Sequence, residues 1–189
     1  MVKVLVWFLV VLGFLMAGLA LNLDLHDFVE TPWYLWPWVP ICALYPFLLA
    51  LNYLYFLWKG EFPWFFLSFT VFGALGYGLI APLFYTLYMV ETGFGWYELG
   101  NIFWVWLYAA QAYFLLRYVR GRGRFGRLPV WQLGLILGYF LTKDLLDRFS
   151  TTWSYVRFGM ISDELMNISF IALLFIHTFL FLYLVKKPK

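Results

Sequence analysis

The feature that most constrains this chain is a series of six long apolar runs separated by short polar segments. The runs cover residues 4–21, 39–58, 63–90, 101–119, 129–149 and 165–185. A helix needs about 20 apolar residues to cross the roughly 30 Å hydrocarbon layer of a bilayer, and each run is close to that length. The sequence therefore predicts an all-α, polytopic membrane bundle with six transmembrane helices, or five if one run does not span.

The composition favours a membrane protein over an ordinary soluble domain. Only 12% of the 189 residues are charged and 65% are hydrophobic, whereas soluble domains carry about 25% charged residues. The six runs nearly exhaust the chain, so we expect one integral membrane domain over residues 1–189 without a soluble module. The first run, 4–21, is long enough to be a retained helix rather than a cleaved signal peptide.

The basic residues predict how the helices are oriented. With the N-terminus in the cytoplasm, ten of the thirteen Lys and Arg residues fall on the cytoplasmic side. Cytoplasmic loops retain positive charge, so we expect both ends inside and a location in the cell membrane. The most basic loop, from Arg117 to Arg127, is interpreted as an anchor for anionic lipid headgroups and not as a nucleic-acid segment. The lipid bilayer is the partner that the sequence predicts.

Charged residues interrupt the fifth run and give the strongest functional signal. Lys143, Asp144, Asp147 and Arg148 lie together near its end, although a charge at mid-bilayer costs roughly 2.5–3.5 kcal/mol on insertion scales. Asp144 and Asp147 are three residues apart and share a helix face. One interpretation is a carboxylate pair facing an outward-opening cavity. The other is a pair of structural ion pairs, Lys143 with Asp147 and Asp144 with Arg148.

Three further residues complete the candidate ligand-binding set. His177 lies near the middle of the last run, Gln111 lies in the fourth, and Tyr77 lies in the aromatic-rich third. With Asp144 and Asp147 they are predicted to line a site for a small ligand. The structural alternatives are a histidine satisfied by a neighbouring helix and a glutamine that hydrogen-bonds across the bundle.

Metal and cofactor sites receive little support. His26, Asp27 and Glu30 would converge on a metal if their segment were helical, but a solvated loop is the favoured alternative. The chain has two histidines and one cysteine, which excludes a multi-cysteine metal site. Haem held by two histidines is disfavoured because His26 and His177 lie at different predicted depths. We therefore predict no metal and no cofactor.

Prolines and glycines predict features of the packing. Pro82 is expected to bend the third span and Pro46 the second, because proline removes a backbone hydrogen bond. Gly73, Gly76 and Gly78 give the third span a smooth face that a neighbouring helix can approach closely. The bends would either improve packing or open a cavity between helices.

Three short segments carry a resemblance to a known family: residues 31–40 (TPWYLWPWVP), 77–81 (YGLIA) and 143–147 (KDLLD). In these segments the chain resembles the YpjA-like family of small multi-pass membrane proteins, whose domain of unknown function is numbered 1405. The sequence departs from that pattern at Ile41 and Cys42, where an acidic or small polar residue is expected, and at Gly76, where a basic residue is expected. The resemblance implies a shared fold and importance for Asp144 and Asp147, but no activity.

Three functions remain open from the sequence. The first is binding or transport of a small cation or amphipathic ligand through an outward-facing cavity of aromatic and carboxylate side chains. The second is an intramembrane enzyme acting on a lipid or isoprenoid, with an aspartate as acid and His177 as base. The third is an accessory subunit of a larger membrane complex. We expect the first, because bent spans and an acidic outer side accompany the carboxylate pair.

Overall fold

The computed structural model describes residues 2–30, 33, 43–121, 129–149 and 163–185, which form six helices without a strand. The helices are α1 (Val2–Glu30), α2 (Leu44–Lys59), α3 (Trp64–Thr92), α4 (Trp96–Gly121), α5 (Val130–Phe149) and α6 (Asp163–Val185). The predicted all-α class is thereby confirmed for the described part of the chain.

Four of the described helices, α1, α3, α4 and α6, are long and apolar enough to cross a bilayer. The other two differ for separate reasons. Helix α2 has 16 described residues, which is short of the roughly 20 that a perpendicular span requires. Helix α5 has 20 residues, but four charged residues, at positions 143, 144, 147 and 148, lie in its last two turns. The length and composition of the four helices identify a helical membrane protein.

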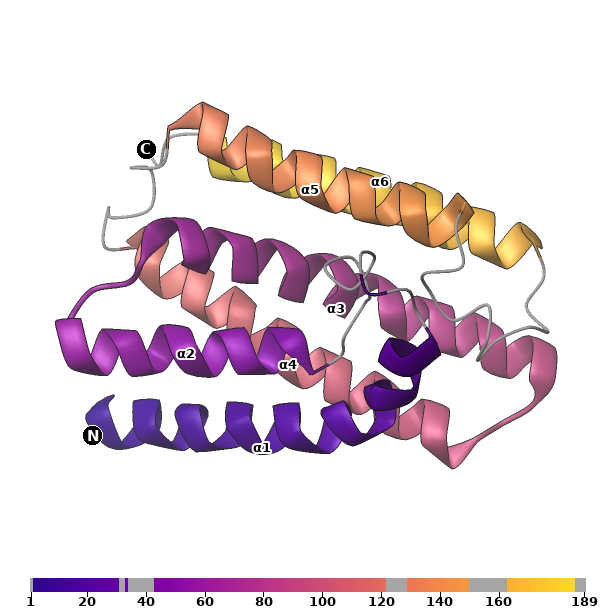
Figure 1. Ribbon diagram of the computed structural model, residues 1–189, viewed down its shortest axis with the longest axis horizontal. Helices are drawn as coiled ribbons and strands as arrows, with labels where there is room; N and C mark the ends of the chain where they lie inside the picture. The colour runs from indigo at the N-terminus through magenta and orange to yellow at the C-terminus, as the bar shows by residue number, and fades with distance from the viewer. Residues whose placement is uncertain (1, 31–32, 34–42, 122–128, 150–162, 186–189) are drawn as a thin grey trace.

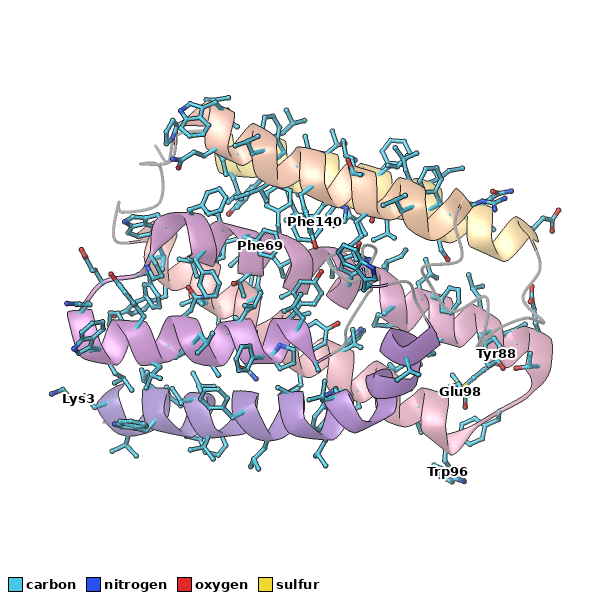
Figure 2. The ribbon with its side chains drawn as sticks, viewed as in Figure 1. Lys3, Phe69, Tyr88, Trp96, Glu98 and Phe140 are labelled. Atoms are coloured by element: carbon cyan, nitrogen blue, oxygen red, sulfur yellow. The ribbon has the colours of Figure 1, made fainter. Side chains whose placement is uncertain are left out.

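Helix α3 lies at the centre of the bundle. It packs against α2, α4, α5 and α6, whereas α1 packs mainly on α2, and α5 pairs with α6. Figure 1 shows α5 and α6 along one edge and α1 along the opposite edge, with the start of α1 and the end of α6 at the same end of the bundle. Figure 2 shows Phe140 of α5 close to Phe69 of α3, and their ring centroids are 5.2 Å apart.

The glycines of α3 allow several neighbouring helices to approach closely, and they do not form one smooth face for a single neighbour. Gly73 lies against the aromatic ring of Tyr45 in α2. Gly78 lies against Ala109 in α4, where an added Cβ would overlap the alanine methyl group. Close approach was predicted for these positions, but the glycines serve different helices. Small residues therefore allow one central helix to be packed on several sides at once.

Pro46 does not bend a span, which corrects the prediction made for it. It is the third residue of α2, and the first turn of a helix has no internal acceptor for its N–H groups, so proline costs nothing there. Pro82 lies inside α3, which continues through it to Thr92. The Thr86 hydroxyl donates to the Pro82 carbonyl at 2.7 Å.

Helix α1 extends beyond its predicted apolar span and ends at Glu30. The segment that contains His26, Asp27 and Glu30 was expected to be a loop, but it is helical. Nothing in that segment breaks a helix until Pro32, which disfavours helical geometry in the residue before it. The side chains of His26, Asp27 and Glu30 lie outside the described residues, so the weak metal-site prediction is not tested.

We expect Gly78→Ala to destabilise the bundle and Gly134→Ala to leave it unchanged or slightly more stable. The first adds a methyl group against the α4 backbone, where the Ala109 Cα would lie 3.3 Å away, whereas the second adds it where nothing lies within 4 Å. Overpacking costs about 1–3 kcal/mol, and replacing a mid-helix glycine by alanine gains about 0.5–1 kcal/mol. Thermal unfolding in detergent measures both changes. Equal stability of the two variants would contradict the close α3–α4 contact.

Candidate functional site

Three helices bring Tyr77, Asp144 and His177 into direct contact. The Tyr77 hydroxyl of α3 donates to Asp144 Oδ1 of α5 at 2.8 Å. His177 Nδ1 of α6 lies 2.7 Å from Asp144 Oδ2. Asp144 and His177 are 1% and 0% exposed, and Tyr77 is 8% exposed. One buried carboxylate thus joins three helices, and we call these residues together with Lys143 the polar cluster.

The helical repeat explains why α6 presents its histidine inward. The buried residues of α6 include Leu173, His177, Leu180 and Leu184, which recur every three or four residues and form one stripe along the helix. A polar residue in such a stripe must find a partner inside the bundle, because a buried polar group without a hydrogen bond is costly. Asp144 is that partner.

Helix α5 presents the carboxylate in the same way. Its buried side chains include Leu133, Ile136, Phe140 and Asp144, again with helical spacing. Because α5 contacts both α3 and α6, residues near the end of this stripe lie between those two helices. The two oxygens of Asp144 therefore have partners on different neighbours.

Aromatic rings enclose the polar cluster. The centroid of the Phe140 ring lies 5.0 Å from that of the His177 imidazole. The Phe72 ring is stacked on the same imidazole at 6.2 Å. On the other side, Tyr45 is stacked on Tyr77 with centroids 5.7 Å apart. Such an apolar enclosure keeps water away and strengthens each electrostatic interaction inside it.

Lys143 belongs to the cluster, although the sequence predicted it only as an ion-pair partner of Asp147 and not as a ligand-binding residue. Its side chain is 2% exposed, and Nζ lies 4.3 Å from the centroid of the Tyr77 ring. An ammonium group over a tyrosine face is held by the quadrupole of the ring. With a neutral imidazole the formal charges of Lys143 and Asp144 cancel, whereas a proton added to His177 leaves one positive charge. The clue available in the sequence was the adjacency of two charges in an apolar run.

His177 Nε2 is buried and has no hydrogen-bond partner among the described residues. It faces Gly76 of α3 so closely that a side chain at position 76 would overlap the imidazole. If Nδ1–H donates to Asp144, the lone pair of Nε2 is unsatisfied, and if the ring is doubly protonated, its second N–H is unsatisfied. An unsatisfied buried group costs about 1–3 kcal/mol, so its presence at this position calls for a functional explanation.

The remaining predicted site residues lie elsewhere or are not described. Gln111 is 7% exposed, and its Nε2 lies 3.8 Å from the Met16 sulfur in α1, outside the polar cluster. This contact matches the interhelical interpretation of Gln111. Asp147 lies in α5, but its side chain is outside the described residues, so its pairing with Lys143 is not tested. Arg148 donates from Nε to Asn167 Oδ1 at 2.8 Å and links α5 to α6.

Comparison with known proteins gives no match: no family model, no curated protein and no solved structure matches the chain. The resemblance to the YpjA-like family therefore stays a prediction. Two of the segments that carry it, residues 77–81 and 143–147, meet in the hydrogen bond between Tyr77 and Asp144. The third, residues 31–40, lies outside the described part of the chain except for Trp33. The function must be inferred from the geometry of the cluster itself.

Proposed function

We propose that the chain is a polytopic protein of the cell membrane that binds and transports a small cation, and that this cation is the proton. In this proposal all six helices span, and both ends of the chain lie in the cytoplasm. The observation that carries it is the buried contact of 2.7 Å between Asp144 and His177, together with the unpartnered Nε2 of the same imidazole. Ionisable groups inside a membrane bundle commonly form proton relays and ion pathways.

The donor set favours a proton over a metal ion. Calcium takes six to eight oxygen ligands, and magnesium takes six in an octahedron, whereas both oxygens of Asp144 already have partners in Tyr77 and His177. No group of three or more His, Cys, Asp or Glu residues converges on one point among the described residues. A proton requires only one lone pair, and a neutral His177 offers it.

Protonation would change the forces between α3, α5 and α6. Imidazole is the side chain that ordinarily changes charge between about pH 5 and pH 8. The titratable groups in contact with His177 are Asp144 from α5 and Tyr77 from α3, and the Lys143 ammonium lies over the Tyr77 ring. A charged imidazole attracts the carboxylate and repels the ammonium, and these forces are strong where water is excluded. The two protonation states therefore favour different positions of α6.

Proton access would require α6 to separate from α3. The contact between Gly76 and His177 closes the site in the described arrangement, which is the condition expected of an occluded state. Alternating access needs such a state, because the site must not open to both sides together. The same contact weakens the enzyme alternative. A carboxylate that orients an imidazole is typical of general-base catalysis, but here no space remains for a lipid substrate at Nε2.

We expect proteoliposomes with the wild-type protein to acidify faster than empty liposomes when a pH gradient is imposed. Asp144→Asn and His177→Gln should reduce the additional rate by more than about tenfold, because each removes a positioned proton-transfer group. His26→Ala is the matched control, since it removes the other of the two histidines and should leave the rate unchanged. An entrapped pH-sensitive dye measures the flux. Wild-type flux equal to that of empty liposomes, or full flux in both cluster variants, would disprove proton transport.

We expect the coupling energy between Asp144 and His177 to depend on pH. A double-mutant cycle with Asp144→Asn and His177→Gln should give about 0.5–3 kcal/mol, as is usual for residues in contact, and the value should change when the imidazole changes charge. The control cycle pairs Asn52 with Thr70, whose hydrogen bond of 3.0 Å contains no ionisable group. Chemical unfolding at several pH values measures both cycles. Coupling that stays constant with pH in both would indicate a purely structural histidine.

A further inference from the structure

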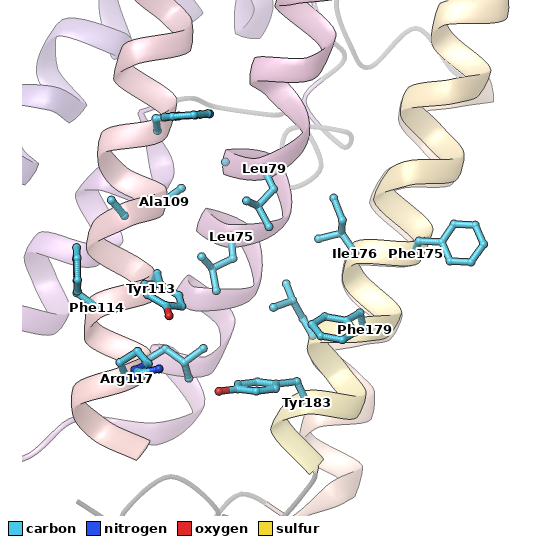
Figure 3. Close-up of a pocket in the computed structure, with 15 residues that line it drawn as sticks. Leu75, Leu79, Ala109, Tyr113, Phe114, Arg117, Phe175, Ile176, Phe179 and Tyr183 are labelled. Atoms are coloured by element: carbon cyan, nitrogen blue, oxygen red, sulfur yellow. The ribbon is translucent and has the colours of Figure 1, made fainter. Parts of the chain in front are cut away.

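A groove of about 1000 Å³ lies between α4 and α6, with α3 as its floor. Leu75 and Leu79 of α3 form the floor, while Ala110 of α4 and Ile176 of α6 belong to the two walls. Figure 3 shows these walls on either side of α3. The groove does not include the residues of the polar cluster. It is therefore separate from the proposed proton site.

The polar groups of the groove gather at one end. Arg117, Tyr113 and Tyr183 line that end, and Figure 3 shows all three there. The rest of the lining is almost entirely leucine, alanine, isoleucine and aromatic side chains. Arg117 is exposed, and among the described residues no carboxylate forms an ion pair with it. The groove is thus long and apolar, with a positive charge at one end.

The length of the groove matches one leaflet of a bilayer. Its lining on α4 runs from Trp106 to Arg117, which corresponds to about 16 Å along the helix axis. Half of the roughly 30 Å hydrocarbon layer is about 15 Å. A ligand with its charged group at Arg117 would therefore extend its hydrocarbon to about the bilayer midplane. This geometry suits an acyl chain better than a compact small molecule.

We propose that this groove is a binding site for an anionic phospholipid, with the lipid phosphate at Arg117 and an acyl chain along the apolar wall. The guanidinium group offers paired N–H donors that match a phosphate. The tyrosine hydroxyls at the same end add further hydrogen-bonding groups. Arg117 lies in α4, close to its end at Gly121, and is the first of five arginines between positions 117 and 127 of the sequence. Such clusters favour anionic lipids at the cytoplasmic leaflet. This site is independent of the proposed proton site.

The test compares two lipids with identical acyl chains, phosphatidylglycerol and phosphatidylcholine, added to delipidated protein. Native mass spectrometry measures how much of each lipid remains bound. We expect the wild type to retain phosphatidylglycerol better. Arg117→Gln should reduce that retention about fivefold, the effect of one basic residue near an anionic surface. It should reduce the retention of phosphatidylcholine less, because the choline ammonium offsets the charge of the phosphate. Ala110→Trp, which fills the groove from an exposed position, should reduce the retention of both lipids.

Two controls keep the result specific. Lys59→Gln removes an exposed positive charge at the end of α2, outside the groove, and should behave as the wild type. Phe103→Trp enlarges an exposed side chain of α4 that does not line the groove and controls for Ala110→Trp. Equal retention of the two lipids by the wild type, or an Arg117→Gln variant that retains phosphatidylglycerol fully, would overturn the proposal. A wild-type dimer that Ala110→Trp dissociates would also overturn it, because a second copy would then fill the groove.

Discussion

The arrangement of α3, α5 and α6 depends on the hydrogen bonds of the Asp144 carboxylate. A buried charge is tolerated only when it is hydrogen-bonded and compensated, and Asp144 has Tyr77 on one oxygen and His177 on the other. Because these partners belong to different helices, the carboxylate fixes the rotation and the depth of both relative to α5. Removing one partner from a buried pair costs about 3–5 kcal/mol, so the same contacts that support the proposed proton binding also fix the three helices relative to one another.

Helix α3 has a second role, because it separates two sites of opposite character. Leu75 and Gly78 line the apolar groove, whereas Gly76 and Tyr77 contact the polar cluster. Successive residues of a helix are rotated by about 100°, so residues 75–78 include positions that face the groove and others that face the polar cluster. This requires small residues, since bulky side chains at Gly76 or Gly78 would push a neighbouring helix away.

The helices and much of the polar cluster could be predicted from the sequence for the same reason. Polar residues are costly inside apolar spans, so the few that occur there stand out and must have partners within the bundle. Asp144 and His177 were predicted because each interrupts an apolar span, and Tyr77 because it belongs to the aromatic residues of the third span; the fold brings the three together. Lys143 was considered only as an ion-pair partner of Asp147, because sequence spacing does not reveal that α3 packs against α5 as well as α6. Gln111 satisfied the same criterion but contacts α1, which only the packing decides. The groove could not be predicted from the sequence either, because the residues that line it are of the types found in any membrane helix.

The position of His177 against the main chain of Gly76 has a kinetic consequence. A nitrogen that accepts a hydrogen bond from a protein group must exchange that partner for a water molecule before water can protonate it. With Nδ1–H donated to Asp144, the Nε2 lone pair has no partner to lose among the described residues. Access of water to this lone pair is then a first requirement for protonation. How often thermal fluctuation separates α6 from α3 at this glycine would therefore limit the rate at which the buried imidazole exchanges protons with water.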